Sequence, residues 1–302
     1  MLRGLRKYWH VIYVLLLVGF SIFVLLKTFV IPSVEKSEVE SIGIYASEET
    51  NIKINQAIST ERSYSDENIS IKLNKDRMYD TTVYIADIKL KNIKYFRTAF
   101  AENSFGRNIN EKVSKIASDK GAILAINGDF YGFRDEGYVT RNGLLYRDNY
   151  AFADDEVFAV FADGSCTIES CGDATAESLM QNGAVQILSF GPGLVEAGEI
   201  DQKGILSNHR TSPEEKNPRT AIGMIEPLHY IFVVCDGRTS EDAGMTLIDL
   251  ANVMKDYGCK EAYNLDGGGS STMYFNGQVV NKPTDGQKSG EREVSDIVYI
   301  GY

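Results

Sequence analysis

The order of apolar and polar positions divides the chain into a long apolar run, a polar segment and a region of alternation. Residues 11–26, VIYVLLLVGFSIFVLL, carry no charge. From Pro32 to about Asp66 the chain is polar and rich in Ser, Glu and Asn. Apolar and polar residues then alternate from Ile69 onward, which is typical of strands with one buried face.

Several segments of this last region predict individual elements. The expected strands are residues 69–76, 81–90, a hairpin over 157–170 with a turn at Asp163-Gly164, 229–237 and 294–302. Helical spacing is clear only near residues 110–119 and 245–257. Because strands outnumber helices, we expect a single α+β domain with a large mixed β-sheet and flanking helices.

The apolar run predicts a transmembrane helix. With its flanks it covers residues 8–31, which exceeds the roughly 20 residues that span a bilayer. Tyr8 and Trp9 suit the headgroup level, and Lys27 can extend outward to water. The alternative is a cleaved signal peptide, but no small-residue cleavage site follows the run. We therefore expect an uncleaved signal anchor.

The charges before this helix predict its orientation. Residues 1–7 contain three basic residues and no acid, so this end should be a cytoplasmic tail. The expected organisation is a tail at 1–7, an anchor at 8–31, a stalk at 32–66 and an extracytoplasmic domain at 67–302.

Composition narrows the possible partners. The 302 residues include 43% hydrophobic ones, enough for a sizeable core. The formal net charge of -11 argues against nucleic acid, because a phosphate backbone needs a basic surface. An acidic domain that holds a phosphate must therefore gather basic residues locally.

The four cysteines leave one question open. Cys166 and Cys171 are too far apart to form a disulfide if they lie on one extended strand, whereas a turn between them would permit it. Cys235 and Cys259 lie in apolar runs and are expected to be buried thiols. No CxxC or His/Cys cluster suggests zinc.

An internal repeat relates the two helical segments. Residues 116–132, IASDKGAILAINGDFYG, and 253–269, VMKDYGCKEAYNLDGGG, agree at six of 17 positions without a gap. Both copies continue to an Asn-Gly turn, at Asn142-Gly143 and Asn276-Gly277. Each unit thus reads as helix, glycine stop, strand, Asn-x-Asp loop and hairpin. We expect the loops at Asn127–Asp129 and Asn264–Asp266 to meet in one cleft, with Asp236 nearby.

The second Asn-x-Asp loop has the composition of an anion site. In NLDGGGSST, residues 264–272, Asp266 stands where a strand should end, and three glycines follow it. Glycines let the backbone approach a ligand closely and present N–H groups to an anion. The hydroxyls of Ser270 and Ser271 would add donors. A tight structural connection is the alternative, although such a turn needs neither the carboxylate nor the hydroxyls.

Other charged residues follow or begin apolar runs. Asp236 and Arg238 follow the run IFVV, and Arg219 begins the run RTAIG. An arginine pair in a cleft can make bidentate contacts to phosphate.

These segments together resemble the phosphodiester glycosidase family. NPRTAIG, VVCDGR, GMTLIDLANVMKDYGCKEAYNLDGGGSSTM and REVSDIVYI follow the family pattern in order, and INGDFYG resembles an earlier block. The resemblance covers roughly residues 110–302, and NLDGGGSST is its most specific part. It places Asn127, Arg219, Asp236, Asp266, Gly267, Gly268, Gly269 and Ser270 on matching positions. Asp129 departs from the pattern, since many members have a small residue there.

The resemblance implies hydrolysis of a sugar-1-phosphodiester in cell-envelope glycan or exopolysaccharide processing. Asp266 and Asp236 are then the leading catalytic carboxylates and Asp129 the third, while Asn127, Arg219, Arg238, the three glycines, Ser270 and Ser271 would bind the phosphorylated glycan. The alternative is a non-catalytic glycan-binding module anchored at the cell surface. The same three carboxylates could instead hold calcium, which prefers oxygen ligands.

Overall fold

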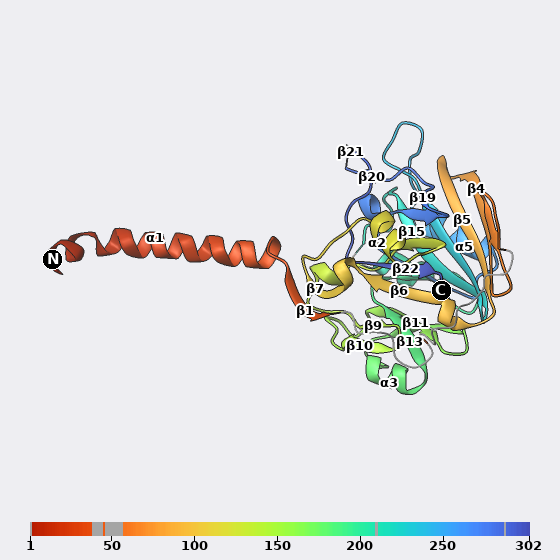
Figure 1. Cartoon of the computed structure of the whole chain (residues 1–302), viewed down its shortest axis with the longest axis horizontal. Helices are drawn as coiled ribbons and strands as arrows, with labels where there is room; N and C mark the ends of the chain where they lie inside the picture. The colour runs from red at the N-terminus through yellow and green to blue at the C-terminus, as the bar shows by residue number, and fades with distance from the viewer. Residues whose placement is uncertain (1, 38–44, 46–56, 209–210, 287) are drawn as a thin grey trace.

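The computed structural model describes residues 2–37, 45, 57–208, 211–286 and 288–302. A single long helix, α1 (Leu2–Phe29), projects from a body of β-sheets and short helices (Figure 1). The shorter helices are α2 (Val113–Asp119), α3 (Ala176–Gln181), α4 (Gln202–Ser207) and α5 (Leu247–Asp256). The α+β class expected from the sequence is confirmed.

Two sheets form the centre of the body. The larger has eight strands in the order β14 (Gly193–Val195), β17 (Glu261–Asn264), β15 (Arg219–Glu226), β16 (His229–Cys235), β5 (Thr81–Leu90), β4 (Ile69–Met78), β3 (Ser63–Ser65) and β2 (Ile58–Ser59). The second has five strands in the order β19 (Gln278–Val279), β18 (Met273–Phe275), β8 (Leu124–Asn127), β22 (Asp296–Ile300) and β6 (Phe96–Phe100).

Three smaller sheets complete the body. One has five strands in the order β10 (Leu144–Arg147), β9 (Val139–Arg141), β13 (Ala184–Leu188), β11 (Glu156–Phe161) and β12 (Cys166–Ser170). The two-stranded pairs are β1 (Ser33–Ser37) with β7 (Ser104–Arg107), and β20 (Thr284–Asp285) with β21 (Lys288–Ser289). The register of each strand pair described is antiparallel, so within these ranges the strands make several antiparallel sheets in place of the large mixed sheet we expected. Eight of these pairs join strands that follow one another along the chain, and such short connections favour antiparallel pairing.

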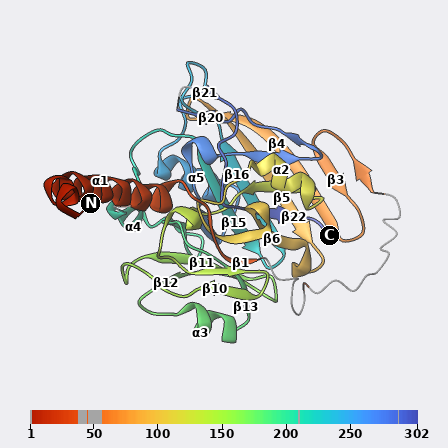
Figure 2. The same cartoon turned by 60° about the vertical axis from the view of Figure 1, so that its left-hand side comes forward.

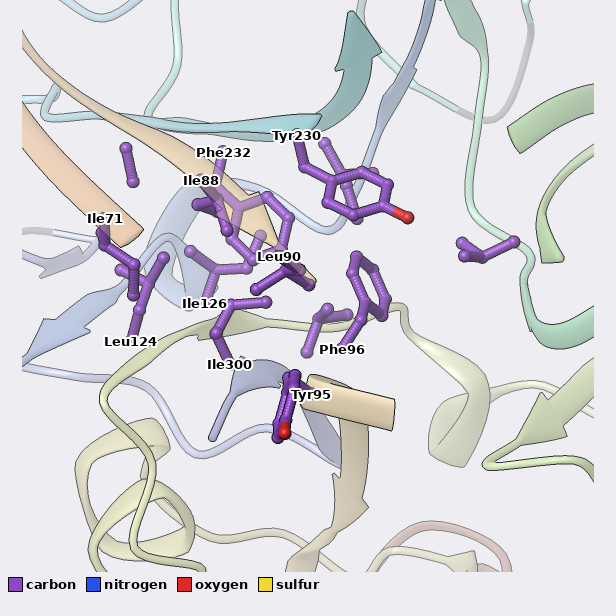
Figure 3. Packing of buried hydrophobic residues seen from close by; sticks show 14 of the residues in the cluster. Ile71, Ile88, Leu90, Tyr95, Phe96, Leu124, Ile126, Tyr230, Phe232 and Ile300 are labelled. Carbon is purple, nitrogen blue, oxygen red and sulfur yellow. The ribbon is translucent and has the colours of Figure 1, made fainter. Parts of the chain in front are cut away.

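The two central sheets pack face to face around the largest core cluster. In Figure 3, Ile88 and Phe232 of the eight-stranded sheet lie against Leu124, Ile126 and Ile300 of the five-stranded sheet. All five side chains are buried. Each such side chain contributes about 1.5–3 kcal/mol when fully removed from water, so this interface is a principal source of stability.

Each helix of the internal repeat covers the outer face of its own sheet. Leu250 and Val253 of α5 pack on the eight-stranded sheet, and Val113 and Ile116 of α2 pack on the five-stranded one. Both helices end before a glycine with positive φ, Gly121 (62°) and Gly258 (84°). Both units then continue as strand, loop, short 3-10 helix and Asn-Gly turn. The order of elements expected from the repeat is therefore present in both copies.

Residues 32–66 are not the free stalk that the polar composition suggested. In the part of this segment that the structure describes, β1 pairs with β7, the side chain of Tyr45 is buried, and β2 and β3 extend the eight-stranded sheet. The Tyr45 hydroxyl donates to the Phe96 carbonyl. Among the described residues of this segment, Tyr45 and Tyr64 are buried, so part of it belongs to the body.

The four cysteines are buried, and none of them forms a disulfide. Cys166 begins β12, and Cys171 directly follows its last residue, so an extended strand separates the two thiols. This arrangement excludes the disulfide that a turn would have allowed.

Candidate active site

The Asn127 carboxamide brings the two repeated loops together. Its Nδ2 donates to the Asp266 carbonyl oxygen at 2.7 Å. Its Oδ1 accepts hydrogen bonds from Thr220 Oγ1 at 2.8 Å and from the Thr272 amide at 3.3 Å. Because Asn127 is fully buried, these bonds form out of contact with water, where losing one is costly. Asn127 thus fixes the main-chain carbonyl of Asp266, the residue whose side chain is the candidate catalytic carboxylate.

The glycines after Asp266 lie directly beneath two arginines. A Cβ at Gly268 would come within 2.9 Å of Arg238 Nη2, and one at Gly269 within 2.7 Å of Arg292 Nε. Gly268 also has a φ of 61°, which disfavours other residues. Gly268 and Gly269 therefore allow guanidinium groups to approach the backbone, while a Cβ at Gly267 would come within 3.0 Å of the Pro218 carbonyl oxygen.

The Asp266 side chain is only partly buried and stays close to the glycine loop. Its Oδ1 accepts a hydrogen bond from the Gly267 amide at 2.9 Å. Burial raises the pKa of this carboxyl, while the Ser270 hydroxyl and the charges of Arg292 and Arg134 act in the opposite direction. A desolvated carboxylate held among positive charges can interact strongly with a developing cation.

The two arginines expected to bind phosphate are placed differently. Arg238 is exposed, and its Nε and Nη2 share the Asn217 Oδ1 at 3.2 and 2.9 Å. Arg219 is buried and donates to the carbonyl oxygens of Met245, Ser212 and Glu215. Arg238 can turn toward a ligand, whereas Arg219 mainly fastens two loop segments. The phosphate-binding role of Arg219 stays a prediction, and its contacts favour positioning.

Asp236 is buried and fastens a loop. Its Oδ1 accepts hydrogen bonds from the Lys282 amide at 2.8 Å and Asn281 Nδ2 at 3.2 Å. The same Asn281 amide donates to the Ser271 carbonyl, so Asp236 is linked to the end of the glycine loop. Burial raises the pKa of Asp236, and Tyr84 lies beside it. Its catalytic role stays a prediction.

Asp129 belongs to a buried ionic cluster with residues that sequence reasoning missed. Arg141 Nη2 lies 2.8 Å from Asp129 Oδ2 and 2.8 Å from Asp296 Oδ2. Asp129 also accepts from the amides of Ser189 and Tyr131. With its oxygens so occupied, Asp129 is arranged to hold neighbouring segments in place, which agrees with its departure from the family pattern.

Aromatic side chains gather beside the Asp266 loop. The rings of Phe130 and Phe133 stack with centroids 4.5 Å apart. The guanidinium of Arg134 lies over Phe130 at 5.6 Å and over Phe190 at 4.9 Å. Phe133 is 38% exposed. An exposed ring of this kind can stack on the apolar face of a sugar.

The three candidate carboxylates do not converge on one cation position. Asp129 faces Arg141, Asp236 faces the 281–282 loop, and Asp266 faces the Gly267 amide. Among the described residues no group of three His, Cys, Asp or Glu side chains is placed to hold a metal ion. Their donor geometry therefore does not match the calcium site considered from the sequence.

Two cavities of the body are not lined by the residues of this candidate site. One of about 590 Å³ lies along β3 and β4, and another of about 200 Å³ lies between Arg62, Tyr84 and Val280. Both are open grooves at the sheet edge, away from Asp266. The candidate site is therefore assigned from the carboxylate, arginines and glycines that lie together, and not from the size of a cavity.

The fold and site together define a domain that can hold an anionic group next to a carboxylate. A model of the phosphodiester glycosidase family matches residues 120–301. The chain belongs to this family.

Individual relatives agree with the family. The chain is 32% identical over 206 residues to the SPbeta prophage-derived uncharacterized protein YomE of Bacillus subtilis (strain 168), covering 66% of this chain and 31% of that protein. It is 26% identical over 207 residues to N-acetylglucosamine-1-phosphodiester alpha-N-acetylglucosaminidase of Mus musculus, covering 62% of this chain and 39% of that protein. The chain thus spans about a third of the length of these curated relatives.

Solved structures show the same fold. The catalytic domain of zebrafish N-acetylglucosamine-1-phosphodiester alpha-N-acetylglucosaminidase, auto-inhibited by its pro-peptide, superposes with a TM-score of 0.62 at 22% identity over 78% of this chain and 83% of that chain. A putative exported protein of Burkholderia pseudomallei K96243 gives a TM-score of 0.53 at 15% identity over 73% and 74% of the two chains.

Proposed function

We propose that the protein is a membrane-anchored extracytoplasmic hydrolase that cleaves a sugar-1-phosphodiester in cell-envelope glycan or exopolysaccharide processing. The observation that carries the proposal is the position of Asp266, whose carboxyl is influenced by Arg134 and Arg292 and followed by glycines beneath Arg238. Family membership and the activity named for the mouse relative support the same reaction class.

The reaction requires a new bond at the anomeric carbon. The oxygen of water bonds to C1 of the sugar, the bond from C1 to the phosphate oxygen breaks, and the phosphomonoester leaves with the electron pair. Asp266 stabilises the positive charge that develops at C1, attacks C1, or activates the water. The leaving group is already acidic, so holding its charge matters more than protonating it.

The arginines around the loop supply that charge. Arg238 and Arg292 lie against Gly268 and Gly269, and the loop amides offer further donors. Arginine suits phosphate because its planar group can bind two oxygens at once. Arg292 is ion-paired with Asp285, whose carboxylate also lies against Gly269, so Arg238 and the loop amides are the main donors available to a phosphate on this acidic chain.

The aromatic residues provide a place for the sugar. Phe133 is exposed and stacks on Phe130, and Arg134 spans from these rings toward Asp266. Phe133 is therefore the exposed ring on which we expect the sugar to stack.

The N-terminal helix supports membrane anchoring. Tyr8–Phe29 is apolar and long enough to cross a bilayer, and the basic residues before it favour a cytoplasmic N-terminus. Asn108 Nδ2 donates to the carbonyls of Thr28 and Ile31, so the end of α1 is bonded to the body. This connection favours retention of the helix over cleavage as a signal peptide.

A non-catalytic glycan-binding module is the second candidate, because the same rings and arginines could bind a phosphorylated glycan without cutting it. The test is release of reducing sugar from synthetic sugar-1-phosphodiesters, with Asp266→Asn as the control. Turnover that depends on Asp266 supports hydrolysis. Saturable binding without release by the wild type would support the binding module instead.

A further inference from the structure

The end of α1 lies at the surface of the catalytic body with almost no intervening chain. The 22 residues Tyr8–Phe29 give about 33 Å of helix at 1.5 Å per residue, which matches the roughly 30 Å hydrocarbon core. Strand β1 begins only four residues after the helix, at Ser33, and pairs with β7. Figures 1 and 2 show α1 leaving the body beside β1. The body is therefore held against the headgroup region.

The residue that binds the helix end also contacts the candidate active site. The Asn108 side chain donates to Thr28 and Ile31, while its backbone amide donates to the Gly132 carbonyl at 3.3 Å. Gly132 lies within the 3-10 turn η4 (Tyr131–Phe133). Arg134, two residues after Gly132, carries one of the charges that act on Asp266. The segment that carries Arg134 is thus hydrogen-bonded, through Asn108, to the end of the membrane helix.

The surface around this junction has the character of a membrane-facing one. Val34 of β1 is 59% exposed and lies opposite Gly106, whose carbonyl is beside Gly132. Phe133 is exposed on the same turn as Gly132. Lys36, on the same strand as Val34, is exposed as well, and its ammonium donates to the Leu145 carbonyl, while the exposed acid Glu35 lies between the two. Exposed apolar and aromatic residues next to a basic one favour contact with lipid headgroups.

We propose that the substrate is an amphiphilic sugar-1-phosphodiester whose phosphate-linked arm is held in the membrane, so that the enzyme acts on molecules lying in the same leaflet. This inference rests on the proposed function and narrows its substrate class. Cleavage at C1 releases the sugar to water and leaves the phosphomonoester on the membrane-held arm. Because enzyme and substrate would lie in the same membrane leaflet, they would meet by two-dimensional diffusion in the membrane and not by three-dimensional diffusion in solution.

The full-length protein is reconstituted in phosphatidylcholine vesicles with the body outside. Two synthetic substrates are compared that have the same sugar-1-phosphodiester head and either a dialkyl lipid or a short soluble alkyl arm. The lipid-linked substrate in the same vesicles should be hydrolysed about tenfold faster or more at equal bulk concentration, because confinement raises its effective concentration. Placing it in separate vesicles should remove the advantage. Equal rates on both substrates in shared vesicles would overturn the proposal.

A linker variant tests the geometry itself. Inserting 20 Gly/Ser residues after Pro32 lifts the body while leaving β1 and the site intact. Hydrolysis of the lipid-linked substrate should fall several-fold, and that of the soluble one should stay unchanged. No change on either substrate would contradict the proposal, whereas loss of both would show that the inserted chain does not fold and requires the next comparison.

Surface substitutions make that comparison without altering chain length. Val34→Glu should slow only the lipid-linked reaction. The matched control is Ile58→Glu, because Ile58 is 69% exposed on the edge strand β2. Equal effects of the two variants would argue against a membrane-facing role for Val34. If the wild type releases sugar from neither substrate, the proposed function itself fails, and the proposal fails with it.

Discussion

The side chain of Asn127 donates to the main-chain carbonyl of Asp266 at 2.7 Å, across 139 positions of sequence. Both residues belong to the repeated Asn-x-Asp unit, one in each copy. The corresponding Asn264 donates to the Gly191 carbonyl, also at 2.7 Å. The asparagine is thus a loop clamp in both copies, while only the second copy presents a carboxylate to the candidate active site.

Replacing Asn127 should impair catalysis because it shifts the position of Asp266. Asn127→Ala removes hydrogen bonds to Asp266, Thr220 and Thr272 inside a dry site. We expect the free energy of unfolding to fall by about 1–3 kcal/mol and kcat to fall more than KM rises. Denaturant unfolding and steady-state kinetics measure the two effects. Asn276→Ala, in the Asn-Gly turn of the second copy, is the control and should leave kcat unchanged.

Removing the charge of Asp266 should abolish most turnover while leaving substrate binding. Asp266→Asn preserves volume but removes the charge that an oxocarbenium-like transition state needs. We expect kcat to fall about 100-fold or more, since each ~1.4 kcal/mol of lost stabilisation is tenfold in rate. In the wild type, the acid limb of the pH–rate profile should lie above the ordinary Asp pKa of 3.8, because burial raises the pKa of Asp266. A near-normal kcat would transfer the catalytic assignment to Asp236.

Replacing Arg238 should mainly weaken substrate binding, whereas replacing Arg219 should mainly lower the stability of the fold. Arg238→Ala should raise KM for the phosphodiester and leave the melting temperature nearly unchanged, because this residue is exposed and lies on Gly268. Arg219→Ala removes a buried donor from three loop carbonyls, so it should lower the melting temperature clearly. Kinetics combined with thermal unfolding test both. The reverse pattern would restore Arg219 as the main phosphate ligand.

The exposed ring should affect recognition of the sugar. Phe133→Ala removes a stacking surface and should raise KM several-fold with a small effect on stability. Tyr79→Ala is a matched control, since Tyr79 is 39% exposed and lies near Asp249 and Asp256 on the α5 side of the sheet. Steady-state kinetics on one sugar-1-phosphodiester compare the two variants. Equal changes in KM for the two variants would show that Phe133 does not contact the sugar.

Secondary-structure elements that depend on local sequence patterns could be predicted from the sequence. Alternation in residues 69–90 predicted β4 and β5, and the glycine stops predicted the ends of α2 and α5. Arg141 and Asp296 could not be paired in this way, because they lie 155 positions apart and each is a lone charge in its segment. Arg292 begins the family block REVSDIVYI but showed no link to Asp266 in the sequence, and Arg134 lies outside the quoted blocks. Only the folded chain shows that they lie around the Asp266 loop.

The buried cluster of Arg141, Asp129 and Asp296 should give stability a specific dependence on pH. Asp296 is fully buried, and its Oδ1 has no hydrogen-bond partner among the described residues. Burial, with Arg141 opposing it and Asp129 adding to it, raises the pKa of Asp296 from 3.8 to about 7. Two carboxylates share one guanidinium, so in the folded state one of them keeps its proton to a higher pH than it would in water.

The direction of this dependence follows from proton binding. Between about pH 4 and pH 7 the folded state keeps a proton on Asp296 that the unfolded chain has lost. Stability due to this group is therefore greatest below pH 4, falls as pH rises to about 7, and is constant above it. Asp296→Asn keeps an oxygen for Arg141 and leaves a single ion pair with Asp129. Relative to the wild type, the variant should become more stable as pH rises from 5 to 7, by up to about 1.4 kcal/mol per pH unit. Urea unfolding at several pH values measures the difference, and a constant difference across this range would show that Asp296 does not hold the proton.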